Sequence, residues 1–124
     1  MTDPEPATAD LPALPISQVR VSGEWVFLAG QGALNEHNEV VGTTIEEQTD
    51  QTLGNIDALL QSAGCRPSDV VSVLVHLSDL SNFDGYNKIY AQFFPDPKPV
   101  RTTVEARLLL GLLIEITVVA RRTR

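Results

Sequence analysis

The run VVSVLVHL, from Val70 to Leu77, is the feature that most constrains how this chain can fold. Its nearly continuous apolar, β-branched character predicts a strand that is buried on both faces. A second apolar run, from Leu112 to Arg121, predicts another such strand. Only two segments of the chain have helical periodicity, and two helices can cover only one face of a sheet. We therefore expect the other face to be covered by self-association.

The first helical segment has clear end signals. Thr44 and Glu47 fit a capping box, and apolar residues then recur at steps of three and four as far as Ala63. Gly64 is expected to end this helix. The second helix is predicted to open at Ser81 and Asp84 and to stop before Pro95.

The remaining elements are predicted strands. Turn residues separate short β-type runs, and the order of elements becomes β-β-(β)-α-β-α-β-β. This order predicts an α+β fold with a single mixed sheet and both helices packed on one face. The expected strands besides Val70–Leu77 are residues 16–21, 25–29, a brief edge segment at 40–41, 101–108 and 112–121.

Length and charge restrict the organisation and the partners. A chain of 124 residues is the size of one domain, here residues 15–124, preceded by a proline-rich arm over residues 1–14 that is expected to be flexible. The net charge of −7 disfavours binding to nucleic acid or anionic lipid. The N-terminal residues have no apolar core, and residues 108–120 are too short to span a bilayer. A cytoplasmic location and no membrane partner are therefore expected.

Several kinds of site are not predicted. Gly30-Gln31-Gly32 lacks the downstream glycine and lysine of a phosphate-binding loop. The lone Cys65 is expected to be a passive thiol, and no metal cluster can be drawn from it and the two distant histidines. His37 lies in a polar turn, and His76 is interpreted as a structural histidine on the buried strand. No metal and no cofactor are expected.

Two charged residues near the C-terminus are the best candidates for chemistry. Prolines at positions 95, 97 and 99 form a stiff, extended approach to Arg101. Strand alternation then places Arg101 and Thr103 on one face of their strand. Glu115 interrupts an apolar strand, where a carboxylate needs a partner. From spacing alone, one interpretation is an ion pair with Arg101 or Arg107 that joins two strands, and the other is a ligand site.

Motifs along the chain resemble the RidA/YjgF family, whose characterised members hydrolyse reactive enamines and imines. The resemblance runs from about residue 14 to residue 121, and its specificity lies in the order and spacing of the motifs. The motifs are Leu14-Pro15-Ile16-Ser17-Gln18, Val26-Phe27-Leu28-Ala29-Gly30-Gln31, residues 48–64, Phe83-Asp84-Gly85-Tyr86-Asn87-Lys88-Ile89-Tyr90 with Phe93-Phe94, Pro99-Val100-Arg101-Thr102-Thr103-Val104-Glu105, and Ile114-Glu115-Ile116.

The resemblance implies a homotrimer of chorismate-mutase-like, YjgF-type domains with ligand sites at the subunit interfaces. It implies that Arg101 grips the carboxylate of a small-molecule substrate and that Glu115 positions the hydrolytic water, releasing a 2-oxo acid and ammonia. The same resemblance assigns a wider set of residues to the substrate pocket: Ile16, Ala29, Gly30, Asn87, Thr102 and Thr103.

The chain departs from the family pattern at three places. Ile16 stands where the deaminases usually have tyrosine, and Thr103 where they often have cysteine. The segment Leu108-Leu109-Leu110-Gly111 is about one residue short and lacks the usual proline. Two alternatives to a small-imine deaminase therefore stay open: a pathway-specific enzyme for a larger unsaturated amino-acid-type substrate, and a non-catalytic carboxylate-binding or regulatory trimer. Ribonuclease activity, also attached to this family, is disfavoured by the acidic charge.

Overall fold

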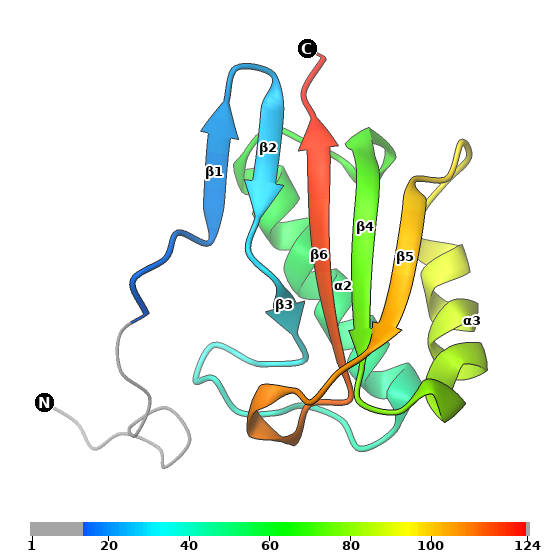
Figure 1. Cartoon of the computed structure of the whole chain (residues 1–124). Coiled ribbons are helices and arrows are strands. Elements are labelled where there is room, and N and C mark those ends of the chain that lie inside the picture. The colour runs from blue at the N-terminus through cyan, green and yellow to red at the C-terminus, as the bar shows by residue number, and fades with distance from the viewer. Residues whose placement is uncertain (1–13, 124) are drawn as a thin grey trace, which may run out of the picture.

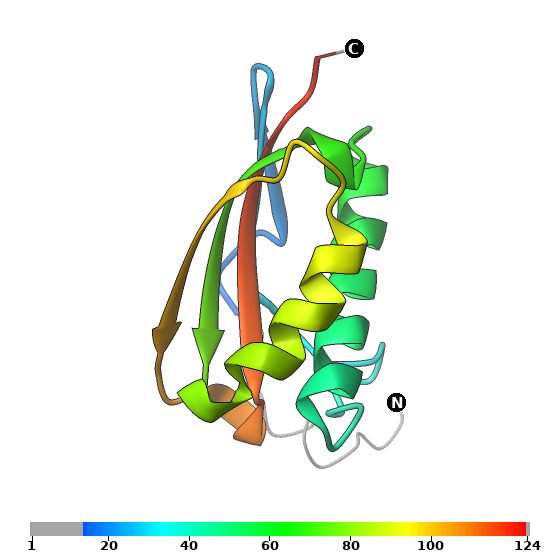
Figure 2. The same cartoon turned by 90° about the vertical axis from the view of Figure 1, so that its right-hand side faces the viewer.

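The protein forms two layers, a mixed sheet and a pair of helices that cover one of its faces (Figures 1 and 2). The computed structural model describes residues 14–123, so the predicted arm at residues 1–14 lies almost entirely outside the described residues. The sheet strands are β1 (Val19–Ser22), β2 (Trp25–Leu28), β3 (Gln31–Gly32), β4 (Val70–Leu77), β5 (Val100–Glu105) and β6 (Ile114–Arg121). The α-helices are α2 (Ile45–Ser62) and α3 (Phe83–Phe93).

The sheet order is β1-β2-β6-β4-β5, with β3 beside β6 (Figure 1). β4 and β5 run parallel and are joined through α3, whereas β6 is antiparallel to both β2 and β4. The C-terminal strand therefore lies between the N-terminal hairpin and the central strand β4. The predicted α+β class, the single mixed sheet and the placement of both helices on one face are confirmed. The predicted edge segment at residues 40–41 is reduced to one bridge between Leu34 and Val40.

Local sequence signals set the ends of α2. The Thr44 side chain accepts a hydrogen bond from the Glu47 backbone N–H, and the Glu47 carboxylate accepts one from the backbone of Thr44 in return. This capping box is worth about 1 kcal/mol. Backbone donors at Thr43 and Thr44 also hold the pKa of the Glu47 carboxyl below its ordinary value. Gly64 follows the helix with φ of +78°, a conformation that favours glycine.

The start of α3 differs from the prediction. Asn82 is the N-cap of α3 and makes no side-chain cap hydrogen bond. Asp79 caps the preceding 3₁₀ turn, Leu80–Asn82, where its carboxylate accepts a 2.8 Å hydrogen bond from the Ser81 backbone N–H. Donation from Ser81 lowers the pKa of the Asp79 carboxyl. Gly85 lies in the first turn of α3 because a Cβ there would come within 2.5 Å of the Ile45 side chain. The glycine lets the two helices approach closely.

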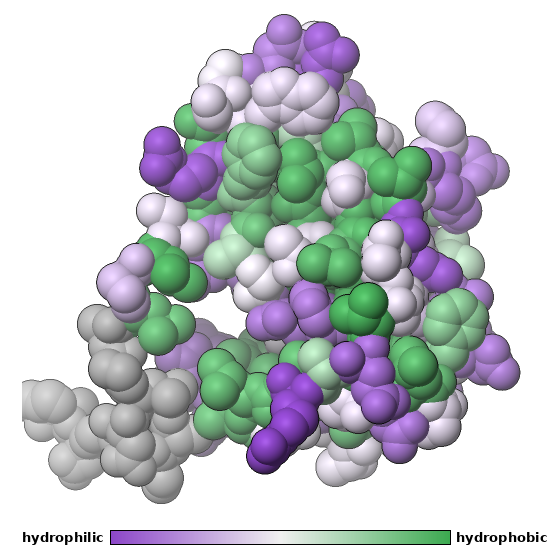
Figure 3. Space-filling view, in the orientation of Figure 1, coloured by the Kyte–Doolittle hydropathy of each residue, from purple (hydrophilic) through white to green (hydrophobic). Residues whose placement is uncertain are grey.

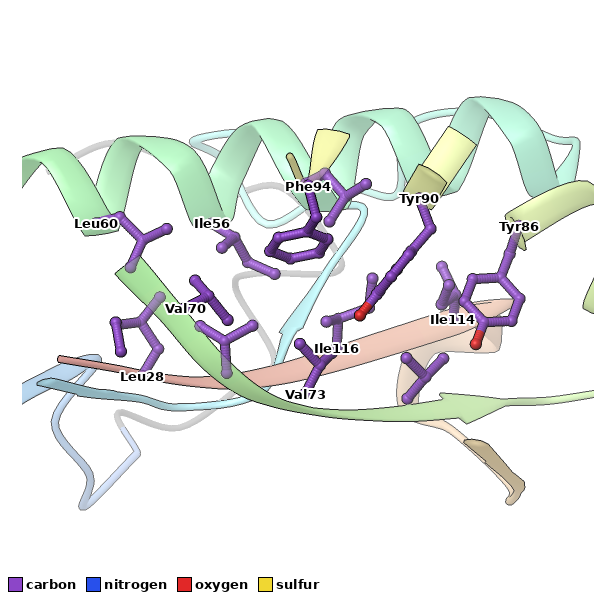
Figure 4. Packing of buried hydrophobic residues seen from close by; sticks show 14 of the residues in the cluster. Leu28, Ile56, Leu60, Val70, Val73, Tyr86, Tyr90, Phe94, Ile114 and Ile116 are labelled. Atoms are coloured by element: carbon purple, nitrogen blue, oxygen red, sulfur yellow. The ribbon is translucent and has the colours of Figure 1, made fainter. Parts of the chain in front are cut away.

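The core lies between the sheet and the helices (Figure 4). Side chains from one face of β2, β4 and β6 interdigitate with one side of each helix, and aromatic residues of α3 fill the space over β4. The buried residues labelled in Figure 4 are Leu28, Ile56, Leu60, Val70, Val73, Tyr86, Tyr90, Phe94, Ile114 and Ile116.

The opposite face of the sheet is open in the single chain. Apolar groups cover much of this face in the space-filling view (Figure 3). The residues that strand pairing places there alternate with the core-facing residues, and five large apolar side chains among them are 38–71% exposed: Trp25, Phe27, Leu74, Val100 and Val104. Because β4 buries only one face within the chain, the prediction of burial on both faces still requires a partner for the open face.

Strand β5 is shorter than predicted, and turns replace its expected C-terminal end. The strand expected to reach Leu108 ends at Glu105, and a 3₁₀ turn follows at Leu109–Gly111. Leu110 has φ of +60° and Gly111 has φ of +71°. A leucine rarely adopts this left-handed conformation, which ends the extended backbone and turns the leucine-rich segment away from the sheet.

Candidate functional site

A cleft of about 1230 Å³ opens at the end of the sheet where β6 begins. Glu115, on β6, is on its wall, opposite the segment that leads into β1 and the turn after β5. Three of the sequence-predicted pocket residues, Ile16, Ala29 and Gly30, line the same cleft. Most of the remaining wall is apolar and includes Leu14, Leu34, Leu59, Leu108, Leu109, Leu110 and Leu112.

Gly30 allows the carboxylate of Glu115 to sit at the cleft wall. A Cβ at residue 30 would lie 2.9 Å from Cδ and 3.0 Å from Oε2 of Glu115, so the carboxylate would have to shift from this position. The neighbouring backbone is fixed by hydrogen bonds, because Ala29 N donates to Gln18 O at 2.9 Å and the Gln31 side chain donates to Ala29 O at 3.0 Å. The sequence therefore places a glycine where a carboxylate passes close to the main chain.

The other oxygen of Glu115 faces His76. The two residues are register partners on the antiparallel strands β6 and β4, and His76 Nδ1 lies 3.8 Å from Glu115 Oε1. Their side chains are 26% and 39% exposed, respectively. His76 Nδ1 itself is buried and makes no hydrogen bond. Interpreted from sequence as a satisfied structural histidine, His76 instead lies beside the carboxylate with an unused ring nitrogen.

Arg101 is held by an aromatic cage on the helix side of β5. Its guanidinium carbon lies 5.5, 5.1 and 4.7 Å from the ring centroids of Phe83, Tyr86 and Tyr90. Arg101 Nη1 donates a 2.6 Å hydrogen bond to Asn87 Oδ1. Cation–π contacts of this kind are worth about 0.5–2 kcal/mol each, depending on how far the cation is desolvated. The cage thus holds one edge of the guanidinium.

The same cage contains a second sequence-predicted residue, Thr103. Its hydroxyl forms a short hydrogen bond with the hydroxyl of Tyr86, of 2.5 Å. Burial raises the pKa of Tyr86, and it raises the pKa of Tyr90 to about 12. Both rings therefore stay neutral around Arg101 at physiological pH. Lys98 anchors the proline-rich approach, because its ammonium group donates to the carbonyls of Ala91 and Phe94 at the end of α3.

The predicted site residues fall into two half-sites. We call Ile16, Ala29, Gly30 and Glu115 the glutamate half-site, and Asn87, Arg101 and Thr103 the arginine half-site. Register and burial place the arginine half-site on the helix side of the sheet and Glu115 on the open side. Thr102 points to the open face of β5 and lines neither. One chain therefore cannot present Arg101 and Glu115 to the same small ligand.

The interpretation of Glu115 as an intrachain strut to Arg101 or Arg107 is wrong. Within residues 14–123, the basic residue within ion-pair distance of Glu115 is His76. β4 separates the strands that carry Arg101 and Glu115, and the two side chains leave opposite faces. Glu115 is thus a carboxylate at a largely apolar cleft, with no arginine partner among residues 14–123.

Sequence reasoning missed the cage residues and His76. Phe83, Tyr86 and Tyr90 recur at spacings of three and four, which places them on one side of a helix but gives no sign that they surround Arg101. His76 could be paired with Glu115 only through the register of β4 against β6. Within residues 14–123, no group of three or more His, Cys, Asp or Glu side chains could hold a metal ion. In the same part of the chain, no helix is long and apolar enough to cross a membrane.

A mixed sheet covered on one face by two helices, with a caged arginine and a separate glutamate cleft, defines this protein as a YjgF-type α+β domain. The chain belongs to the RidA/YjgF family: the family model described as Endoribonuclease L-PSP matches residues 7–122. A RutC family protein of Saccharolobus solfataricus is 41% identical over 117 residues, which cover 93% of each chain.

Another relative carries a functional name. Reactive Intermediate Deaminase A, a chloroplastic protein of Arabidopsis thaliana, is 39% identical over 108 residues, which are 86% of this chain and 58% of the relative. Among solved structures, RidA from the Antarctic bacterium Psychrobacter sp. superposes with a TM-score of 0.84 at 28% identity over 98% of this chain and 99% of that one. A crystal structure from Thermotoga maritima reaches 0.86 at 33% identity and full coverage of both chains.

Proposed function

We propose that this protein hydrolyses reactive enamine and imine intermediates derived from amino acids. The reaction of the imine form is R–C(=NH₂⁺)–COO⁻ + H₂O → R–CO–COO⁻ + NH₄⁺. The single observation that carries the proposal is the pair of half-sites: a caged arginine suited to a carboxylate, and a glutamate beside His76 at a largely apolar cleft. The name of the Arabidopsis relative supports the same chemistry.

Arg101 is assigned to the substrate carboxylate. A guanidinium offers two parallel donors in the geometry of a carboxylate, which a lysine cannot reproduce. Asn87 occupies one nitrogen, Nη1, and the three rings restrict rotation of the group. The remaining N–H groups can bind the substrate with little further loss of side-chain entropy.

Glu115 is assigned to the water. The carbon of a protonated imine is already electrophilic, so a positioned water and a proton acceptor suffice for attack. As the C–O bond forms, Glu115 takes a proton from the water. It returns that proton to nitrogen in the tetrahedral intermediate. The C–N bond then breaks and ammonia leaves, while Glu115 accepts the hydroxyl proton and the oxygen becomes the carbonyl of the 2-oxo acid. Transfer of this proton to ammonia gives ammonium and restores the Glu115 carboxylate.

The complete site is assigned to the interface between two chains of a homotrimer. The arginine half-site and the glutamate half-site lie on opposite sides of one sheet, so a complete site needs each half from a different copy. The open face supplies an apolar surface for that association. In a closed ring of three chains every half-site finds its complement, and no half-site is left unused.

Light scattering should therefore report a mass of three chains at micromolar concentration. The physical reason is the exposed apolar face, which a monomer would leave in water. A charged substitution in that face, Phe27→Asp, should shift the protein toward smaller species. The control Gln92→Asp introduces the same charge at an exposed position on α3, outside both half-sites, and should leave the mass unchanged. A wild-type protein that stays monomeric across the concentration range would contradict this architecture.

The apolar cleft favours substrates with larger apolar side chains. Leucines make up much of its wall, and Ile16 brings no hydroxyl to it. Each additional buried methylene should add about 0.8 kcal/mol to transition-state binding. An amino-acid oxidase can generate imines from alanine, leucine and methionine in a coupled assay. We expect kcat/KM to be highest for the leucine and methionine imines.

The variant Ile16→Tyr provides the control for that preference, because it replaces the aliphatic wall with a phenol hydroxyl. The ratio of kcat/KM for the leucine imine over the alanine imine should fall in this variant. Equal values for all imines in the wild type, or a preference for the smallest, would count against the apolar specificity. This expectation also favours the second candidate function, an enzyme acting on a larger unsaturated amino-acid-type substrate, because the cleft is large.

The coupled assay also separates the enzyme from its alternatives. Acceleration of imine loss with release of ammonia supports the deaminase. Binding of 2-oxo acids without any turnover would support a non-catalytic carboxylate-binding trimer instead. Ribonuclease activity is disfavoured by the net charge of −7, which repels a phosphate backbone.

A further inference from the structure

We infer that His76 is a positioning residue that holds Glu115 in the orientation needed to bind the hydrolytic water, which rests on the proposed function of Glu115. One ring nitrogen of His76, Nδ1, has no hydrogen-bond partner. It is buried and lies 3.8 Å from Glu115 Oε1. A buried polar atom without a hydrogen-bond partner costs about 1–3 kcal/mol of stability. A hydrogen bond from His76 Nδ1 to the nearby Glu115 carboxylate would offset this cost.

The two carboxylate oxygens of Glu115 lie in different surroundings. Oε1 faces the imidazole, whereas Oε2 lies against Gly30 at the wall of the cleft. A proton on Nδ1 makes His76 a donor to Oε1. Oε2 is then free to accept from the water. Catalytic hydrogen bonds are often long before the substrate binds and shorten in the reactive complex, which fits the present separation.

The surroundings of His76 leave Glu115 as its polar partner. On β5 the register partner of His76 is Val104, and on β6 it is Glu115. Glu115 is therefore the titratable group that faces the imidazole from the two flanking strands. The tautomer of a histidine is set by the hydrogen bond that one of its nitrogens makes, so Glu115 should fix the proton on Nδ1.

Two substitutions of His76 test its effect on turnover in the coupled assay. His76→Leu removes the donor and should lower kcat on the order of tenfold, as loss of a ligand-orienting partner does elsewhere. KM should stay unchanged because the arginine half-site is intact. His76→Asn places an amide N–H near the position of Nδ1 and should recover most of kcat. The control His37→Asn changes the chain's other histidine, in an exposed turn, and should behave as wild type.

A spectroscopic test does not depend on activity. The two histidines give separate side-chain signals in a ¹H–¹⁵N spectrum, recorded above about pH 8 where imidazoles are neutral. His76 should appear with its proton on Nδ1, and this preference should be lost in Glu115→Ala. His37 should give the same spectrum in both proteins.

The outcomes separate this inference from the proposed function. Wild-type kcat in His76→Leu, or equal losses in the leucine and asparagine variants, would overturn the positioning role while imine hydrolysis stands. An unchanged His76 tautomer in Glu115→Ala would also overturn it. If the wild type hydrolyses no imine, the proposed function fails, and the spectrum alone decides whether His76 and Glu115 are coupled. Melting temperatures and oligomer mass, measured on every variant, identify any that fail to fold.

Discussion

Arg101→Ala is expected to lower kcat/KM for amino-acid-derived imines, with a loss of transition-state stabilisation of about 2–5 kcal/mol. The reason is that it removes the charged partner of a carboxylate in a partly dry site. Arg101→Lys should recover little of this loss, since an ammonium group cannot make the two-pronged contact and is more strongly hydrated than a guanidinium. The coupled oxidase assay measures both variants.

A matched control for this prediction lies elsewhere on the sheet. Arg121 also stacks on a ring, 5.8 Å from the centroid of Trp25, and also has a polar partner, Glu24 at 2.9 Å. Because Trp25 belongs to the open face, Arg121→Ala is compared with the wild type at a concentration where light scattering shows the same oligomer. There it should keep the kcat/KM of the wild type, since the ion pair lies outside both half-sites. Full activity in Arg101→Ala, with an intact oligomer and an unchanged melting curve, would contradict the deaminase mechanism.

Glu115→Gln is expected to lower kcat by roughly 10²–10⁴-fold with a much smaller change in KM. Glutamine keeps the size and shape of the side chain but cannot take the proton from water. Substrate binding through Arg101 should persist, so a 2-oxo acid should still bind to the variant. Calorimetric titration with the product, run beside the coupled assay, separates the two effects.

The surface glutamate Glu24 supplies the control for this substitution. Glu24→Gln weakens an exposed ion pair with Arg121 and should change neither kcat nor KM. A purely structural role for Glu115 makes the reverse prediction, a lower melting temperature or loss of the oligomer without a selective fall in kcat. Circular dichroism melts and light scattering on Glu115→Gln distinguish these results.

Local patterns predicted the parts of the fold that depend on neighbours in sequence. The capping box of Thr44 and Glu47 was predictable because both partners lie within one helical turn. The shared face of Arg101 and Thr103 followed from strand alternation alone. The end of β5 at Glu105 could not be predicted from local patterns, because the turn that follows depends on an unusual left-handed leucine, Leu110.

The arrangement of the site was harder to predict because it depends on strand order and register. Arg101 and Glu115 are separated by β4, a fact that no spacing within the sequence encodes. The pairing of His76 with Glu115 likewise follows from the antiparallel register of β4 against β6, which joins residues 39 positions apart in the sequence. The aromatic cage could not be predicted either, because it depends on the tertiary packing of α3 near β5.

The two-sided placement of the half-sites has a consequence for how the activity responds to concentration. Under the proposed mechanism, a lone chain is inert, and dilution that dissociates the ring extinguishes turnover without unfolding any domain. In the proposed trimer, each chain contributes its arginine half-site to one neighbour and its glutamate half-site to the other. Under this proposal, damage to one half-site leaves the other half-site of that chain able to complete a site with an intact neighbour.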